Sequence, residues 1–428
     1  MAVVDDQPYG GTCELRGCDP KKVLVGVADL IDRQRRMTGS GVTGDANIDW
    51  ASLMRFKRTF TDPTPARHQA EFDKAGIVTY RGSARFTGDD SVCIAAVGTT
   101  LDIQAKHFVI ASGAEPVALG IPGEEHVRTS TDFLDLDKLP ARICFIGAGY
   151  ISFEFAHIVQ RAGRTGTQAI VLGRGAPLDR FDQDVVARLV AHTRSEGIDL
   201  RTDTAVVSVE RMGDRYRVHV TTDNGADSVD ADLVVHGAGR VPRTKQLDLH
   251  RANVATDERG AVLVNEFLQS TSNPRVYASG DCTHPAGSLP LTPVASHDGI
   301  VVASNLLQGN NRKPDYRGTP SVVFTVPPLA TVGLTEAEAR RQRIDVRVKC
   351  EDTASWFTNR RVRQPAAMFK TIVESGTDRI VGAHLLGPDA ADVINVFALA
   401  VRHGLTASDL KQMIYAYPTS TSDVSYML

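Results

Sequence analysis

Residues 10–22 read Gly10-Gly11-Thr12-Cys13-Glu14-Leu15-Arg16-Gly17-Cys18-Asp19-Pro20-Lys21-Lys22 and place Cys13 and Cys18 five positions apart. The pair stands beside a predicted helix start. A helix N-terminus and neighbouring lysines stabilise a thiolate, so we expect a lowered pKa for one of the two cysteines. Closing so short a loop stabilises a fold little, which indicates a redox-active disulfide rather than a structural one. The alternative is two buried cysteines that never pair.

This segment resembles the redox motif of the flavin-dependent pyridine nucleotide-disulfide oxidoreductases, the family of glutathione reductase, dihydrolipoamide dehydrogenase and mercuric reductase. The resemblance implies that Cys13 is the interchange thiol, which meets the substrate. It implies that Cys18 is the charge-transfer thiol against the flavin. Gly11 and Thr12 would then contact FAD.

Composition is that of an ordinary globular protein, with 428 residues, 42% of them hydrophobic and 23% charged. A net charge of -3 gives no reason to expect nucleic acid or a membrane surface as a partner, so we expect a small molecule. No stretch approaches the ~20 apolar residues of a membrane span, and the N-terminus does not resemble a signal peptide, so we expect a cytoplasmic protein. The remaining four of the six cysteines have no paired spacing, and we predict no metal site.

The residues before the motif predict a short buried strand over 2–6 that ends in acids. The resemblance places Asp5 where an acid binds the adenosine ribose of FAD, with a solvated strand end as the alternative. In the family a strand and a GxGxxG phosphate loop come before this point, and neither is in the sequence given. We therefore expect a misplaced start; a non-catalytic nucleotide-binding remnant that has lost FAD is the rival hypothesis.

A dinucleotide signature lies at Gly147-Ala148-Gly149-Tyr150-Ile151-Ser152-Phe153-Glu154, between a predicted strand over 142–146 and a predicted helix. Gly147 and Gly149 permit a tight turn and close approach of a pyrophosphate. The resemblance implies that Tyr150 is the gate over the flavin where nicotinamide arrives.

Two lysines and one acid complete the expected flavin surroundings. By resemblance Lys21 or Lys22 lies near flavin N5, and Glu154 is the partner of the lysine that follows Cys18. A solvated helix acid is the alternative for Glu154, and the apolar residues around it disfavour that interpretation.

The strand predicted over 169–172 ends without an acid and is followed by Arg174 and Arg180. An acid at this position binds the ribose of NAD, whereas arginines accommodate the 2′-phosphate of NADP. The sequence therefore favours NADPH, with two surface arginines that bind no ligand as the alternative.

Several later segments resemble parts of the family's flavin site. They are the turn at which the chain leaves the flavin domain, the crossover back, the second FAD motif and the backbone at the flavin ring. The corresponding residues are Ser112 and Gly113, Arg240, Gly280 and Asp281, and Leu291, Thr292 and Ala295.

We predict an α/β fold with two Rossmann-like domains, for FAD and NAD(P)H, and a C-terminal α+β interface domain. The predicted boundaries are 1–115 and 237–314 for the FAD domain, 116–236 for the NAD(P)H domain and 315–428 for dimerisation. Strands are predicted over 77–86, 92–97 and 108–111. The resemblance implies an isologous homodimer whose subunits complete each other's active sites.

The family's disulfide reductases carry a His-Pro-Thr segment near the C-terminus, beside the partner subunit's interchange thiol. Here the segment is Tyr417-Pro418-Thr419. Tyrosine, with an ordinary pKa near ~10, is a poor general base at neutral pH, so we do not expect the usual proton relay. The C-terminal cysteine pair of mercuric reductase is absent from this sequence as well. We predict an NAD(P)H:disulfide oxidoreductase of redox homeostasis whose acceptor, a small disulfide, a quinone or a metal ion, stays open.

Overall fold

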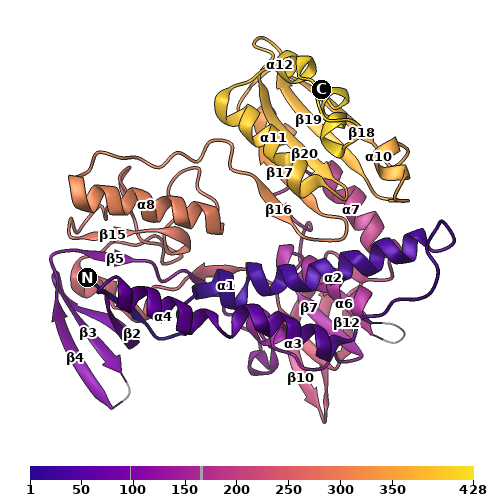
Figure 1. Cartoon of the computed structure of the whole chain (residues 1–428). Coiled ribbons are helices and arrows are strands. Elements are labelled where there is room, and N and C mark those ends of the chain that lie inside the picture. The colour runs from indigo at the N-terminus through magenta and orange to yellow at the C-terminus, as the bar shows by residue number, and fades with distance from the viewer. Residues whose placement is uncertain (97, 164–166) are drawn as a thin grey trace. The chain divides into compact units, whose positions relative to one another are not determined.

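The computed structural model describes residues 1–96, 98–163 and 167–428 (Figure 1). It divides into two compact units. The first consists of Met1–Pro20, Lys57–Val117 and Arg240–Tyr316, and the second of Lys21–Phe56, Ala118–Gly239 and Arg317–Leu428. In the described ranges no helix is both long and apolar enough to cross a bilayer. The α/β class is confirmed, and the four domain boundaries stay predictions.

Small sheets build the first unit. One has the order β1-β2-β3-β4, with β1 parallel to β2 and the other pairs antiparallel; its strands are β1 (Ala2–Asp5), β2 (Val78–Gly88), β3 (Ser91–Ala96) and β4 (Thr99–Gln104). Two strand pairs complete the unit: β5 (Phe108–Ile110) parallel to β15 (Val276–Ala278), and β6 (Ala114–Pro116) antiparallel to β14 (Arg240–Pro242). Val97, at the end of a predicted strand, lies outside the described residues.

The prediction that the first strand is buried is wrong. β1 lies at the edge of its sheet, and its residues are exposed or half-buried. An apolar run such as Val3-Val4 indicates a strand, but the strands on either side of it decide how deeply it is buried.

Helices of the first unit carry the cysteine motif. They are α1 (Gly11–Arg16), α4 (Thr64–Lys74), α8 (Thr292–Gln308) and the first turn of α2 (Cys18–Met37), with short 3-10 turns at η2 (Lys245–Leu247), η3 (Leu249–Ala252) and η4 (Gly280–Cys282). Figure 1 shows α8 alongside β15 and β5. Gly17 separates α1 from α2, because a Cβ there would lie 2.9 Å from the Thr12 carbonyl oxygen. The helix therefore starts at Cys18, and Cys13 lies in a separate short helix that the sequence did not predict.

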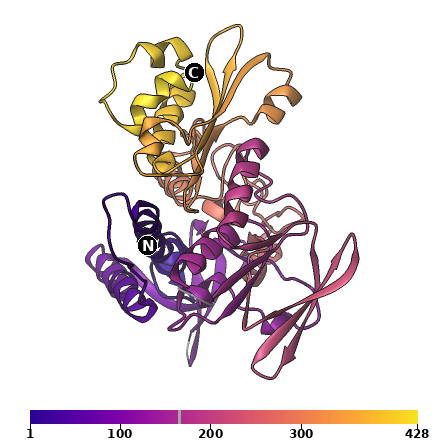
Figure 2. The same cartoon turned by 90° about the vertical axis from the view of Figure 1, so that its right-hand side faces the viewer.

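A parallel sheet of order β13-β7-β8-β9 forms the centre of the dinucleotide-binding part of the second unit. Its elements are β7 (Arg142–Ile146), α6 (Tyr150–Ala162), β8 (Gln168–Leu172), α7 (Gln183–Ser195), β9 (Asp199–Arg201) and β13 (Leu233–His236). This alternation of strand and helix is the doubly wound pattern. An antiparallel arm, visible in Figure 2, contains β10 (Ala205–Met212), β11 (Arg215–Thr222) and β12 (Gly225–Ala231). The short elements η1 (Glu124–His126) and α5 (Ser130–Leu134) precede the sheet, and α3 (Trp50–Thr61) runs from this unit into the other.

The C-terminal part of the second unit is a five-stranded antiparallel sheet of order β16-β17-β20-β19-β18. Its strands are β16 (Ser321–Val323), β17 (Leu329–Gly333), β18 (Val346–Asp352), β19 (Met368–Glu374) and β20 (Ile380–Leu386). Helix α11 (Ala390–His403) packs on β17 and β20 through buried residues such as Ile394 and Phe397. The other helices are α9 (Glu336–Arg341), α10 (Phe357–Arg360), α12 (Ala407–Gln412) and the 3-10 helix η5 (Ser420–Tyr426). This is the α+β architecture predicted for dimerisation.

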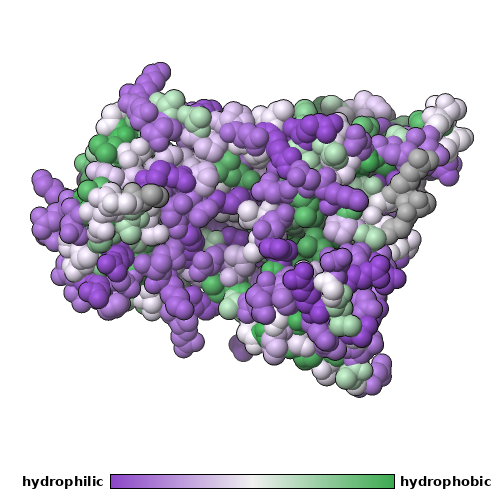
Figure 3. Space-filling model, turned by 90° about the horizontal axis from the view of Figure 1, so that it is seen from below, coloured by the Kyte–Doolittle hydropathy of each residue, from purple (hydrophilic) through white to green (hydrophobic). Residues whose placement is uncertain are grey.

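Figure 3 shows one face of the molecule with each residue coloured by its hydropathy. Hydrophilic side chains predominate on it, and hydrophobic ones form small separate patches. Scattered apolar residues of this kind are usual on protein surfaces.

Candidate redox and dinucleotide sites

The dithiol pair lies at the junction of two helices. Cys13 is inside α1 and Cys18 is the first residue of α2, and both are thiols in the structure. The Thr292 hydroxyl oxygen, at the start of α8, lies 3.4 Å from the Cys18 sulfur. A hydrogen bond with the Cys18 side chain, and next burial, raises the pKa of Cys13. The lowered pKa expected for one of the two cysteines is thus not found at Cys13 and stays a prediction for the pair.

Residues that fit a flavin meet at the ends of two paired parallel strands. Ser112 and Gly113 follow β5 and Asp281 follows β15, so all three lie at the same edge. The Ser112 hydroxyl oxygen is buried with no hydrogen-bond partner in the described ranges. Gly113 has a φ of 69°, and a Cβ there would meet no atom within 4 Å. A buried hydroxyl without a hydrogen-bond partner, next to a glycine with free space around it, fits a polar ligand such as FAD.

The charge of Asp281 is set by two opposing effects. Burial raises its pKa, and the nearby Arg240 guanidinium opposes that rise. The same guanidinium donates a hydrogen bond to the Ala114 carbonyl oxygen, which holds Arg240 beside strand β6. Asp281 is thus a half-buried acceptor, suited to a ribityl hydroxyl.

The N-terminal candidates lie in the same unit. A Cβ at Gly11, whose φ is 63°, would meet no atom within 4 Å, and Thr12 beside it is exposed on α1. Asp5 ends β1, and its Oδ1 accepts the Gln7 backbone N–H at 2.8 Å. Burial raises the pKa of Asp5.

The turn at Gly280 is held by residues that sequence reasoning missed. A Cβ on Gly280 would lie 3.0 Å from the Cβ of Ala295, one turn into the helix that follows Leu291. The buried Asp298 carboxylate accepts the Gly280 N–H at 3.2 Å and the Tyr316 hydroxyl at 2.8 Å. Asp298 therefore holds the backbone of the turn that immediately precedes Asp281.

A second missed interaction joins two chain segments that are distant in sequence. Arg243 donates to both carboxylate oxygens of Asp6, at 2.6 and 3.0 Å, and so ties the end of β1 to the end of β14. The two residues are 237 positions apart, and no local pattern predicts the pair.

Replacing Ser112 by alanine tests the flavin assignment. We expect FAD affinity to fall roughly three- to tenfold, the value of one hydrogen bond. Stability of the flavin-free protein should not fall, because the variant removes an unsatisfied buried hydroxyl. Fluorescence titration with FAD and urea unfolding of the flavin-free protein measure the two quantities. Ser228→Ala, at an exposed serine of β12, is the matched control. Unchanged FAD affinity would contradict the assignment.

Lys21 and Glu154 form a buried ion pair between α2 and α6. The Lys21 ammonium lies 2.8 and 2.7 Å from the two carboxylate oxygens, and the Glu154 side chain is 1% exposed. Glu154 also accepts the backbone N–H of Phe324 at 2.8 Å. The ammonium of Lys22 lies 3.9 Å from the centre of the Phe324 ring, and burial, aided by the Lys21 charge, lowers the pKa of Lys22. Of the two candidate lysines, the partner of Glu154 is Lys21.

The dinucleotide signature at residues 147–154 has its expected context. Gly147 follows β7 with a φ of 100°, and a Cβ there would lie 2.5 Å from the Gly237 carbonyl oxygen. Gly149 is the N-cap of α6, whose first residue, Tyr150, is 44% exposed. The N–H groups at such a helix start suit a pyrophosphate.

Arg174 and Arg180 follow β8, which neighbours β7 in the sheet. Both are exposed, and neither takes part in an ion pair among the residues that the structure describes. Their guanidinium groups are thus available to an anionic ligand at this edge.

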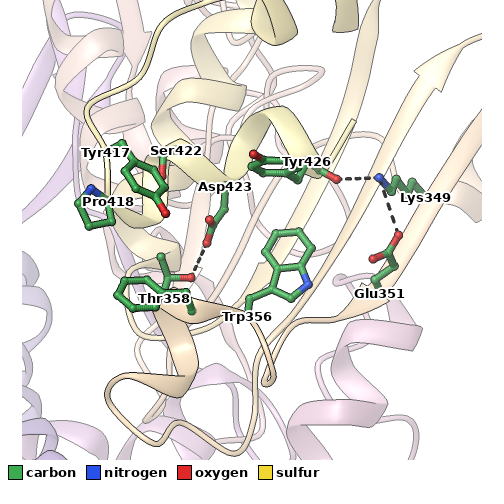
Figure 4. A pocket seen from close by; sticks show the side chains of 10 residues that line it. Lys349, Glu351, Trp356, Thr358, Tyr417, Pro418, Ser422, Asp423 and Tyr426 are labelled. Carbon is green, nitrogen blue, oxygen red and sulfur yellow. Dashed lines mark hydrogen bonds and ion pairs between the residues drawn. The ribbon is translucent and has the colours of Figure 1, made fainter.

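A cavity of about 460 Å³ lies near the C-terminus, within the five-stranded part of the second unit (Figure 4). We call it the C-terminal cavity. Tyr417, which is 79% exposed, is the predicted site residue that lines it. Its other lining residues, from β18, α10 and the last segment, are Lys349, Glu351, Trp356, Phe357, Thr358, Pro418, Ser422, Asp423 and Tyr426. None of these others is among the predicted site residues, although Pro418 belongs to the segment Tyr417-Pro418-Thr419 that the sequence analysis singled out.

Comparison with known proteins gives the following matches. The profile of the pyridine nucleotide-disulphide oxidoreductases matches residues 1–299, and the profile of that family's dimerisation domain matches residues 319–427. A glutathione reductase of Burkholderia cepacia is 33% identical over 421 residues, which cover 98% of this chain and 91% of that protein. A mercuric reductase of Streptomyces lividans is 33% identical over 430 residues, covering 98% and 88%. The Cu(II) complex of the HOCl-induced flavoprotein disulfide reductase RclA from Escherichia coli superimposes with a TM-score of 0.87 at 27% identity, covering 100% of this chain and 92% of that one.

Proposed function

The chain belongs to the pyridine nucleotide-disulphide oxidoreductase family, and we propose that it passes electrons from NADPH through FAD to a Cys13–Cys18 disulfide and on to a small acceptor. The observation that carries the proposal is the geometry of the dithiol pair: Cys13 in α1 and Cys18 at the start of α2, with the Thr292 hydroxyl oxygen 3.4 Å from the Cys18 sulfur. The family's dimerisation domain supports a homodimer as the working form.

FAD, when bound, accepts a hydride from NADPH and supplies two electrons to the disulfide. Breaking the S–S bond leaves Cys13 as a thiol and Cys18 as a thiolate, with one proton taken up. The Cys13 sulfur then attacks an acceptor disulfide and releases one thiol. Cys18 attacks the resulting mixed disulfide, releases the second thiol and restores the Cys13–Cys18 bond.

In the proposed function, residues of the second unit bind NADPH. The N-terminus of α6, behind Gly147 and Gly149, would hold the NADPH pyrophosphate, and Tyr150 would cover the nicotinamide site. The buried Glu154 would fix the position of Lys21, and the positive charge of Lys21 would act on the flavin.

A small disulfide is the acceptor we propose first. Two of the relatives are a glutathione reductase and a mercuric reductase, which favour a disulfide and a metal ion, respectively, as the acceptor. Tyr417 in place of histidine keeps the metal ion as a second candidate, because reduction of an ion needs no proton donor for a leaving thiol.

An anaerobic NADPH titration of the purified protein tests the proposal. We expect a flavin band near ~450 nm that bleaches as NADPH is added, with a long-wavelength band from a thiolate beside the flavin. Reduction should consume two equivalents of NADPH, one for the flavin and one for the disulfide. A colourless protein would favour the nucleotide-binding remnant, and reduction complete at one equivalent would contradict the disulfide.

Exchanging Arg174 and Arg180 for alanine tests the nucleotide preference. We expect kcat/KM for NADPH to fall roughly ten- to a hundredfold, the value of one to two hydrogen bonds to a charged group. The value for NADH, which lacks the 2′-phosphate, should change little. Steady-state kinetics with both nucleotides measure the ratio, and Arg211→Ala, on the antiparallel arm, is the control. An equal loss of kcat/KM for both nucleotides would mean that the arginines do not bind the 2′-phosphate.

A further inference from the structure

Four of the ten residues that line the C-terminal cavity are aromatic. They are Trp356, Phe357, Tyr417 and Tyr426. Figure 4 shows the Asp423 carboxylate among the rings of Tyr417, Tyr426 and Trp356. Aromatic ring faces carry partial negative charge and attract cations.

The charged residues of the lining differ in whether they have an ion-pair partner. The ammonium of Lys349 lies 3.7 Å from the Glu351 carboxylate and donates to the Tyr426 carbonyl oxygen at 2.6 Å, so it is already engaged. Asp423 accepts a hydrogen bond from the Thr358 hydroxyl and takes part in no ion pair within the described ranges. Burial raises the pKa of Asp423, which means that water solvates its charge poorly.

We propose that this cavity binds an organic cation, an ammonium or guanidinium group on a short apolar carrier, between the aromatic rings and the Asp423 carboxylate. The volume of about 460 Å³ lies in the range of small-molecule sites. One lysine and two acids give the lining a net negative formal charge, which disfavours the binding of anions.

The inference names the acceptor class and, to that extent, depends on the proposed function. An acceptor disulfide whose arms carry amines would place one ammonium in the cavity, and its S–S bond would be reduced by Cys13 with restoration of the Cys13–Cys18 disulfide. The two electrons come from NADPH, and the products are two aminothiols.

Binding is tested without redox chemistry. The chain has two tryptophans, so Trp50→Phe leaves Trp356 in the cavity as the sole reporter. We expect 1,6-diaminohexane to change its fluorescence saturably, and the isosteric 1,6-hexanediol to have no such effect. Asp423→Asn should weaken diamine binding about tenfold or more. The control Asp392→Asn, at an exposed acid of α11, removes the same charge outside the cavity and should change nothing.

Calorimetric titration of the protein with both tryptophans repeats this comparison, should Trp50→Phe fail to fold. Equal binding of diamine and diol, or diamine binding that is unaffected by Asp423→Asn, would overturn the inference. A diamine affinity that depends on Asp423 supports it, whether or not the protein reduces anything.

A second experiment measures the turnover of disulfides that differ in charge. We expect kcat/KM for cystamine, a disulfide with two ammonium groups, to exceed that for neutral bis(2-hydroxyethyl) disulfide about tenfold or more, and anionic dithiodiglycolate to be poorer still. Asp423→Asn should bring the first ratio toward one, and Asp392→Asn should leave it unchanged. Reduction of all three without preference overturns the inference and leaves the proposed function standing. Diamine binding with no disulfide reduced at all supports the cation site and contradicts the proposed function.

Discussion

Cys13→Ser will abolish disulfide reduction while NADPH still reduces the flavin. A serine hydroxyl is not ionised at neutral pH and forms no S–S bond, so neither the attack nor the mixed disulfide is possible. We expect kcat with any disulfide acceptor to fall by about 10³-fold or more. The NADPH titration should stop near one equivalent, because only the flavin is left to reduce. Steady-state assays and the anaerobic titration measure the two effects.

The pH dependence of the unaltered protein belongs to the same prediction. The pKa of Cys13 is raised, so at neutral pH its thiol is protonated, and the fraction present as the nucleophilic thiolate grows as pH rises. The rate of attack on an acceptor should therefore increase from pH 7 toward alkaline pH. Cys350→Ser, at an exposed thiol of β18, controls for general thiol effects and should retain full activity. Loss of activity in both serine variants, or an unchanged rate in Cys13→Ser, would show that Cys13 is not the nucleophile.

The rise in the Cys13 pKa bears on the missing histidine. The hydrogen bond with the Cys18 side chain raises that pKa and so opposes loss of the Cys13 proton. In the enzyme we propose, a base outside the pair, such as hydroxide, therefore removes this proton, which agrees with the expected increase of the rate with pH. Tyr417, which is largely exposed in the C-terminal cavity, is available to contact the acceptor.

Sequence alone predicted the parts of the site that lie on consecutive residues. The Cys13–Cys18 motif, the Gly147–Gly149 turn and the Gly280-Asp281 turn each combine a backbone requirement with a chemical group in one short segment. Such segments carry their own local signal, so they can be identified without a structure.

Tertiary contacts account for what the sequence could not predict. Asp6 and Arg243 meet across 237 positions, and Thr358 meets Asp423 across 65 positions. The strand β17 contains Ala330, Thr331 and Gly333, and its strand character comes from pairing with β20 rather than from its own composition. Burial of the first strand was mispredicted for the same reason: neighbours, not the strand itself, decide it.

The Lys21–Glu154 pair predicts the largest loss of stability. In Lys21→Met the Glu154 carboxylate, 1% exposed, keeps the Phe324 N–H as a hydrogen-bond donor and loses its only ion-pair partner in the described ranges. An uncompensated buried charge of this kind costs about 3–5 kcal/mol of unfolding free energy. Replacing both partners, in Lys21→Met/Glu154→Leu, removes the charge as well and should restore much of that loss. Lys22→Met, which removes only the contact with the Phe324 ring, should cost no more than about 1–2 kcal/mol. Urea unfolding of the four proteins measures these differences. A single variant at Lys21 that is as stable as the unaltered protein, or a double variant less stable than the single one, would show that the pair does not hold α2 against α6.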